Sequence, residues 1–391
     1  MKRKQKRYLK PYTLREKVQI YIKWQRPLSG KVLLVIILGL TVLLVVLQSV
    51  SRSINTWRVG NAAVNASSAY SDDRFQATFV GDIMLGRNIA RAGESGDYDD
   101  LFESASYLWN DSDYVFGNLE CTIIDDVSSY KEAEKEIHLA ADTEALAAVG
   151  KAGFTLLGIA NNHIGDYGRK GMMTTLANLE KVNIQYTGLN ETLAEGLLYK
   201  REQYDGLTIS TCAISNIVVP DSESASAEDI LSINNCDYQV LVANAAAVSD
   251  LTIVAIHWGV EYSKDISQSQ QELAYELIDA GADIIIGAHP HVLQPLEIYN
   301  DGIIFYSLGN FVFDQGWMRT KDSVLVNLII EDGRKYLNIY PMRINNGIPA
   351  YALVSLSAGR TLRQMTKLLD IDQYHIEDNI LVVEWGTYEK R

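Results

Sequence analysis

The sequence predicts an α/β fold with largely buried sheets, and two observations lead to it. From Phe75 onward, seven short apolar runs each end in glycine or a polar residue, as buried strands do. Amphipathic stretches at helical spacing lie between several of these runs, and such alternation is typical of α/β proteins. The expected strands are 76–81, 113–118, 154–160, 207–214, 251–259, 282–288 and 302–310, and the expected helices are 143–153, 169–182 and 270–281.

A single membrane-spanning helix is expected before this domain. Residues 1–31 carry eleven Lys or Arg and one acid, whereas the rest of the chain carries 24 basic and 48 acidic groups, a net of −24. Between the two parts, residues 32–50 contain no charge, and as a helix they would span about 28 Å, close to the hydrocarbon thickness of a bilayer. The basic flank predicts a single-pass protein of the cell membrane, with residues 1–31 cytoplasmic and the main domain extracellular.

A cleaved signal peptide is the alternative, since SVS at 49–51 offers small residues for cleavage. The apolar run is longer than the roughly 7 to 15 residues of a signal-peptide core, which favours an uncleaved anchor. The basic segment would then fix orientation and contact anionic lipid. The acidic outer part gives no indication of a nucleic-acid partner.

The outer part is expected to hold one domain. Residues 51–74 are rich in Ser, Asn and Ala and predict a linker. The domain covers 75–345, and 346–391 form a C-terminal extension of it that could close a sheet edge. The polar segment 220–250 is expected to form surface excursions. Three cysteines, Cys121, Cys212 and Cys236, form neither a CxxC pair nor an even set, so we expect core residues rather than disulfides.

Polar residues follow five of the predicted strands. In GAHPHVLQP, His289 and His291 come directly after an apolar run, and Pro290 favours an extended conformation at Ala288 and His289. Ligands and reactive groups in open α/β sheets lie outside the carboxyl ends of the strands. The residues delivered to such ends are Asp82, Asn118, Glu120, Asn161, Asn162, His163, Asp166, His257, Glu261, His289 and His291.

This mixture of side chains suits one or two divalent metal ions, of which Mn, Zn and Fe fit best. Carboxylates can bridge two metal ions, and two such ions together can activate water for displacement at phosphorus. Each element has an ordinary alternative: a lone histidine is usually a hydrogen-bonded structural residue, GNLE a turn, and NNHIGDYG a helix entry. The recurrence at five strand ends is what favours a metal site.

Three other polar residues carry weaker indications. Arg87 in GDIMLGR could neutralise an oxyanion near the metal or could form a surface salt bridge. His138 and His375 have no second candidate ligand near them in the sequence, so structural or solvated roles are expected for both.

Six motifs in this order resemble the CapA/PgsA family of poly-γ-glutamate capsule synthesis proteins. They are GDIMLGR, GNLECTI, ANNHIGDYG, HWGVEY, GAHPHVLQP and YSLGNFVFDQGW, and they cover roughly residues 75–320. A short inner segment, one span and a large outer domain match that family as well. The family is similar in turn to the calcineurin-like metallophosphoesterases, which implies two facing β-sheets flanked by helices in a four-layer sandwich.

The resemblance implies roles for the first strand-end residues. Asp82 matches the first aspartate of the phosphoesterase pattern, and Glu120 stands where the bridging aspartate would be. Asn162 and His163 match the Asn-His pair, in which the asparagine is a ligand and the histidine assists the leaving group or phosphate. His163 is therefore the catalytic candidate.

The later motifs complete the implied ligand set. His257 matches the isolated ligand histidine, and His289 and His291 match the final HxH pair, each going to a different metal. Other strand-end and loop residues remain candidates for substrate contact or for support of the ligands, namely Arg87, Asn118, Asp166 and Glu261.

One departure from the pattern concerns Met84, which stands where the phosphoesterases have a histidine. A thioether is a poor ligand for a hard or borderline ion. One metal keeps four candidate ligands, whereas the second keeps only Asp82, Glu120 and His291. The resemblance alone therefore does not imply phosphoesterase activity of the usual kind.

Three functions follow as hypotheses. The resemblance and the topology imply an accessory component of poly-γ-glutamate synthesis or export, beside a membrane-embedded synthase and in reach of the polymer, although an acidic outer part repels a polyanion in bulk. The metal-type residues suggest an extracellular metal-dependent hydrolase acting on a phosphoester or a γ-glutamyl amide. A third possibility is a binding module that retains a structural ion.

Overall fold

The structure is a computed structural model that describes residues 74–89, 98, 100–190, 198–204, 206–217, 227–352 and 356–387. The expected cytoplasmic segment 1–31, the expected anchor 32–50 and the expected linker as far as residue 73 lie outside the described residues. Within the described ranges, no helix has the length and apolar character of a membrane span. The chain from Tyr70 to Arg391 forms one compact unit, to which the following refers.

The described strands form two large sheets and one small one. The first sheet has the order β17-β18-β15-β14-β1-β2-β5-β6, with β13 paired to β1 and β16 to β15. Its strands are β1 (Phe75–Ile83), β2 (Tyr114–Leu119), β5 (Leu156–Gly158), β6 (Gln185–Thr187), β13 (Asn310–Val312), β14 (Asp322–Glu331), β15 (Arg334–Asn345), β16 (Ile348–Tyr351), β17 (His375–Glu377) and β18 (Ile380–Thr387).

The second sheet has the order β11-β12-β10-β9-β8-β7, and β3 pairs with β4 in the small one. These strands are β7 (Lys200–Tyr204), β8 (Leu207–Ser215), β9 (Leu251–His257), β10 (Ile284–Ala288), β11 (Leu293–Tyr299), β12 (Gly302–Leu308), β3 (Thr122–Ile123) and β4 (Ala140–Ala141). The described helices are α4 (Asp100–Glu103), α5 (Thr143–Lys151), α6 (Gly168–Lys181), α7 (Tyr238–Ala246), α8 (Gln268–Asp279) and α9 (Leu356–Met365), with short 3₁₀ turns η1 (Ser106–Leu108), η2 (Val127–Ser129), η3 (Ala227–Asp229) and η4 (Thr366–Leu368).

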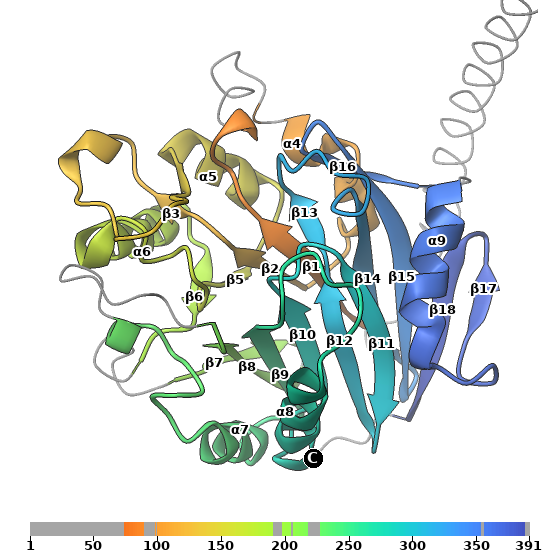
Figure 1. Ribbon diagram of the computed structural model, residues 1–391. Coiled ribbons are helices and arrows are strands. Elements are labelled where there is room, and N and C mark those ends of the chain that lie inside the picture. Colours follow the sequence, from red (N-terminus) through yellow and green to blue (C-terminus); the bar gives the residue numbers. More distant parts are fainter. Residues whose placement is uncertain are drawn as a thin grey trace, which may run out of the picture. The chain divides into compact units, whose positions relative to one another are not determined.

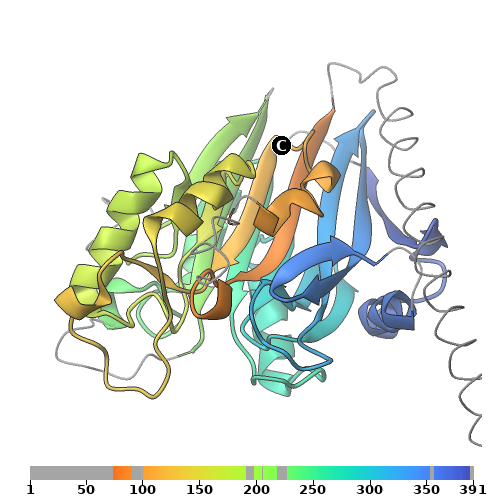
Figure 2. The ribbon, with the colours of Figure 1, turned by 90° about the horizontal axis from the view of Figure 1, so that it is seen from above.

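The predicted α/β fold is confirmed: all seven predicted strands and all three predicted helices are present. The two sheets face each other, since β1 of the first contacts β10 and β12 of the second. Figures 1 and 2 show the strands in the interior of this unit with helices on the outside.

Strand β9 shows why the sheets are buried on both faces. Its side chains alternate, so Ile253 and Ala255 pack in the large core cluster that both sheets share. Val254 and Ile256 point the other way, into a separate cluster with residues of α7 and α8. A strand covered on both faces has a nearly continuous apolar sequence, and for this reason LTIVAI predicts a buried strand.

Helix α7 was not predicted, because the segment 220–250 is polar on average and was expected to form surface excursions. Asp237 caps the helix by accepting a hydrogen bond from the backbone N–H of Val240. Leu241, Val242 and Ala245 are buried, while the intervening residues are exposed. A single apolar face is enough for the helix to pack against β8 and β9, although the mean polarity of the segment conceals it.

Candidate metal centre

The parallel strands of each sheet end at one edge, which brings the strand-end residues together. In the first sheet, Asp82 of β1 lies opposite Asn118 of β2 and Asn310 of β13. In the second sheet, Ala288 at the end of β10 lies opposite His257 at the end of β9. The loop after β10 then continues directly into the HxH pair.

Two groups of buried side chains result, and Glu120 belongs to both. Glu120, His257 and His289 offer ligand atoms within 4.8 Å of one another, and so do Asp82, Glu120 and His291. These are the carboxylate and imidazole members of the two ligand sets that the resemblance implies. Asn162 joins the first set, because its Oδ1 lies 2.8 Å from Nε2 of His257. Such a donor set can hold a divalent metal ion.

Glu120 is the least satisfied polar group of this cluster. Its side chain is fully buried, and neither carboxylate oxygen has a hydrogen-bond partner. The Nε2 atoms of His257 and His291 each lie 3.7 Å from Oε1, too far for a hydrogen bond. Nδ1 of His289 is also buried without a partner. An unpaired buried carboxylate is costly, and a cation bound among these atoms would satisfy it.

Burial and the neighbouring charges also shift the pKa values of Glu120 and His291. Burial raises the pKa of Glu120 well above its usual value, and the carboxylates of Asp82 and Glu261 raise it further against the lowering effect of His291. Burial lowers the pKa of His291, but Glu120 and Asp82 outweigh it and raise the pKa to about 9. Without a metal, Glu120 and His291 therefore retain a proton between them at neutral pH.

The other two ligand histidines are neutral at the same pH. Burial, reinforced by neighbouring histidines, lowers the pKa of His257 well below its usual value. Burial together with His291 lowers the pKa of His289 to about 4. A neutral imidazole offers the lone pair that a metal needs, so both rings are ready to bind one.

The HxH loop has an unusual backbone. His289 and His291 have φ angles of 93° and 56°, a region that residues with a side chain seldom adopt. The expectation of an extended His289 is therefore wrong: the local preference before proline gives way to tertiary contacts. The carbonyl of Pro290 accepts a hydrogen bond from the N–H of Tyr262 at 2.8 Å, and Nδ1 of His291 lies 3.0 Å from Oδ1 of Asn310. Such strain is typical of functional sites.

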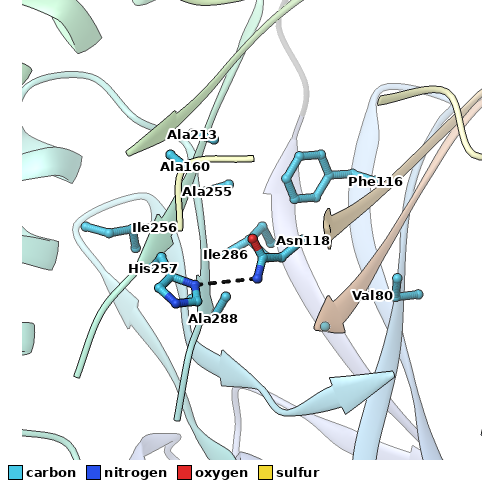
Figure 3. A pocket seen from close by; sticks show the side chains of 12 residues that line it. Val80, Phe116, Asn118, Ala160, Ala213, Ala255, Ile256, His257, Ile286 and Ala288 are labelled. Atoms are coloured by element: carbon cyan, nitrogen blue, oxygen red, sulfur yellow. Dashed lines mark hydrogen bonds between the residues drawn. The ribbon is translucent and has the colours of Figure 1, made fainter. Parts of the chain in front are cut away.

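Asn118 connects the two sheets behind the cluster. Its Nδ2 donates to Oδ1 of Asp82 at 2.9 Å. The same nitrogen lies 3.5 Å from Nδ1 of His257 (Figure 3). The small pocket around this pair is otherwise lined by glycines and apolar side chains, including Val80, Phe116 and Ile286. Asn118 is therefore a support for the ligand side chains.

His163 sits in a polar network of its own. Its Nδ1 lies 2.8 Å from Oδ2 of the fully buried Asp166 and 3.2 Å from Nζ of Lys135. Lys135 also forms an ion pair with Asp166 and donates to the backbone carbonyl of Asn162 at 2.6 Å. Burial lowers the pKa of His163, so the ring is neutral at neutral pH. The role of Lys135 was missed, since nothing in KEAEKEIH distinguishes it from a solvated lysine.

Several other predicted residues lie outside the two ligand groups. Arg87 forms a salt bridge with Asp314, which is the second of the two expected alternatives. Met84 is fully buried in the core, and its sulfur accepts a hydrogen bond from the N–H of Gly86 at 3.1 Å. Glu261 is exposed.

His138, His375 and Asn310 also lie outside the two ligand groups. His138 is structural, with Nε2 2.7 Å from the carbonyl of Ala133, and His375 lies on β17 at the sheet edge. Asn310 contacts His291, although no role was predicted for this residue of YSLGNFVFDQGW. Its position at the end of a predicted strand is the signal that could have identified it. No disulfide joins the three cysteines, as expected, and Cys121 and Cys212 are buried.

Comparison with known proteins identifies the family of this chain. Residues 76–315 match the model described as "Bacterial capsule synthesis protein PGA_cap". The chain is 36% identical over 362 residues to the capsule biosynthesis protein CapA of Bacillus anthracis, covering 91% of this chain and 86% of that protein. It is 38% identical over 314 residues to the PGA biosynthesis protein CapA of Bacillus subtilis (strain 168), covering 79% and 82%.

A more distant relative has a related description. Over 168 residues the chain is 29% identical to a probable polyglutamine synthesis accessory protein of Mycobacterium tuberculosis (strain ATCC 25618 / H37Rv), covering 40% of this chain and 44% of that protein. The match to the family model and the two CapA relatives, which cover most of both chains, are decisive. The chain belongs to the PGA_cap family of bacterial capsule synthesis proteins.

Proposed function

We propose that this protein is a membrane-anchored, extracellular component of poly-γ-glutamate synthesis or export, and that it works through a divalent metal centre built around Glu120. The observation that carries the metal centre is the fully buried Glu120 side chain, whose carboxylate oxygens have no hydrogen-bond partner and which shares one ligand group with the neutral His257 and His289. Membership of a capsule synthesis family supports the biological setting.

The ligands divide into a fuller and a poorer set. Glu120, Asn162, His257 and His289 would hold one ion, whereas Asp82, Glu120 and His291 would hold a second with fewer donors. A bound ion would supply a Lewis acid that polarises an oxygen and lowers the pKa of a water molecule. The fuller set favours at least one ion per chain, with Mn, Zn and Fe as the candidates.

His163 is the residue proposed to move a proton. The Asp166 carboxylate at 2.8 Å favours a proton on Nδ1, which leaves the lone pair of Nε2 in the neutral ring free to accept a proton and then to pass it on. Lys135 holds the carboxylate in place through its ion pair. This arrangement favours the second candidate function, an extracellular hydrolase acting on a phosphoester or a γ-glutamyl amide.

The topology of the proposal rests on the sequence. The uncharged segment 32–50 would anchor the chain, the basic segment 1–31 would contact anionic lipid on the inner side, and the anchor would bring the domain beside membrane-embedded synthase components. The relatives described as capsule, PGA and polyglutamine synthesis proteins support a role beside such a synthase.

The test combines complementation with metal analysis of the full chain. In a polymer-producing bacterium that lacks this gene, the intact gene should restore surface polymer, and Glu120→Ala should not. Elemental mass spectrometry of the two purified full-length proteins should find at least one ion per chain in the first and little in the second. His375→Ala, on the exposed strand β17, is the matched control and should behave like the intact chain.

Two results would contradict the proposal. Polymer restored fully by Glu120→Ala would remove the metal centre from the function. Failure of the intact gene to restore polymer, with the protein present in the membrane, would remove the capsule role. His163→Ala separates the two candidate functions, because restored polymer in that variant argues for the accessory role and against the hydrolase.

A further inference from the structure

A basic surface lies beside the metal centre of this acidic protein. Helix α9 and the turn η4 that follows it, residues 356–368, contain three basic residues and no acid. The helix contacts β11, β14 and β15 and stands beside β15 in Figure 1. Two loop residues and one residue of β15 add to it, so that the surface comprises Lys264, Arg319, Arg343, Arg360, Arg363 and Lys367.

Three side-chain contacts fix the relative positions of these segments. Gln364 of α9 donates to the carbonyl of Lys264 at 2.8 Å, and Lys367 pairs with Asp265 at 2.8 Å. Arg343 donates to the carbonyl of Met318 at 3.0 Å, which places β15 against the loop that contains Arg319. The segments therefore form one continuous surface.

The acidic groups on this surface do not neutralise it. Arg343 and Arg360 share a single buried carboxylate, that of Asp322, with contacts of 2.6 Å each. Asp265 is paired with Lys367, and among the described residues no ion pair is found for the exposed side chains of Lys264, Arg319 or Arg363. Positive charge is left over in a chain whose residues after 31 carry a net of −24.

An aromatic pair joins this surface to the metal centre. The ring of Trp317 stacks on that of Tyr262, with centroids 5.5 Å apart and an angle of 12° between the planes. Tyr262 in turn lies with its centroid 6.1 Å from the ring of His291. Trp317 and Met318 are 70% and 69% exposed, so the path from the basic surface to the ligands is lined by side chains open to contact.

We propose that this surface, formed by α9, η4, the end of β15 and residues 260–265 and 314–319, binds a linear polycarboxylate and holds it beside the metal centre. The inference rests on the proposed function and specifies how a polyanion can approach an acidic protein. Arginine forks and lysines bind successive carboxylates, and the Tyr262–Trp317 stack offers a face to the methylene and amide groups between them. Glu261, which precedes Tyr262, is exposed and repels carboxylates, so we expect the polymer to bind on the α9 side of the stack.

A residue-resolved footprint of the full chain tests the proposal. Hydroxyl radicals oxidise exposed methionines, and mass spectrometry reads each site separately. Poly-γ-glutamate at low ionic strength should slow the oxidation of Met318 several-fold and leave Met173 of α6, which is 43% exposed, unchanged. High salt should weaken the protection, because the contacts lie at the surface.

Variants identify the charges responsible. Arg319→Glu with Arg363→Glu should abolish the protection of Met318. Arg201→Glu with Arg334→Glu, two exposed positions on β7 and at the opposite end of β15, makes the same change in net charge and should retain it. The basic segment 1–31 is common to all these chains, so any polymer it binds does not affect the comparison.

Three outcomes would overturn the proposal: no protection of Met318, equal protection of both methionines, or protection by phosphatidylglycerol vesicles but not by polymer, which would assign the surface to a membrane. The footprint requires neither turnover nor a bound metal. Its failure would therefore remove the polymer surface while leaving the complementation and metal-content tests of the proposed function standing.

Discussion

Oδ1 of Asn162 lies 2.8 Å from Nε2 of His257, and this contact joins two sheets. Asn162 follows β5 of the first sheet, whereas His257 ends β9 of the second. Neither sheet holds a complete ligand set, because Glu120 comes from the first and the histidines of both groups from the second. The candidate metal centre therefore depends on the two sheets remaining packed face to face, and we expect metal binding to stabilise that packing.

Glu120→Gln should have opposite effects on stability with and without metal. The substitution removes a buried carboxylate that has no hydrogen-bond partner, so in a chelator the thermal midpoint should stay constant or rise. With metal in excess, the wild-type chain should gain about 2.7 kcal/mol at a hundredfold excess over Kd, and the variant should lose most of that gain. Differential scanning fluorimetry with and without chelator measures both effects.

His289→Ala provides a comparison within the same centre. It removes a ligand from one group only, whereas Glu120→Gln affects both. Metal content should therefore fall less in His289→Ala than in Glu120→Gln. Equal metal content in Glu120→Gln and wild type would contradict the shared-ligand arrangement.

Met84→Ala should reduce stability without changing metal content. The side chain is fully buried among core residues and belongs to neither ligand group. Truncating a buried methionine costs about 2–5 kcal/mol, which chemical denaturation of the full chain would measure. A loss of bound metal from the folded variant would show that the sulfur is a ligand after all.

Lys135→Met should destabilise the protein because it leaves the Asp166 carboxylate buried without its cation. Breaking a buried pair by removing one partner costs about 3–5 kcal/mol. The double variant with Asp166→Asn should recover part of this loss, and a double-mutant cycle from denaturation midpoints gives the coupling energy. Additive effects would show that the pair is not a unit.

The exposed pair of Lys367 and Asp265 is the matched control for this cycle. Both side chains are at least half exposed, with a contact of 2.8 Å. Surface pairs contribute little, so Lys367→Met should leave the unfolding transition almost unchanged.

The strands and the polar residues that follow them can be predicted from the sequence for one shared reason. A buried parallel strand must be apolar, so runs such as ADIIIG mark both the strand and the point where it ends. A polar residue placed directly after such a run, like His289 or His257, is thereby assigned to the ligand edge of the sheet. Periodicity thus predicts the edge of the sheet at which these residues gather.

Residues that act from irregular segments could not be found in this way. Lys135 approaches His163 from a segment with no regular secondary structure, so no periodic pattern distinguishes it. The left-handed conformation of His289 is set by contacts with distant segments. The local preference of a residue before proline for an extended conformation opposes it. Long-range packing decided both features.

Gly287→Ala should disturb the centre through the backbone rather than through a ligand. A Cβ at this position would lie 2.0 Å from the carbonyl oxygen of Tyr306, and backbone cannot move aside as a flexible side chain can. Strand β10 would shift against β12, and His289 and His291 follow β10 directly. We expect a lower unfolding midpoint together with weaker metal binding, measured by denaturation and by metal titration. Gly316→Ala is the control, because nothing lies within 4 Å of the added Cβ, and a loss of metal affinity there equal to that of Gly287→Ala would contradict the mechanism.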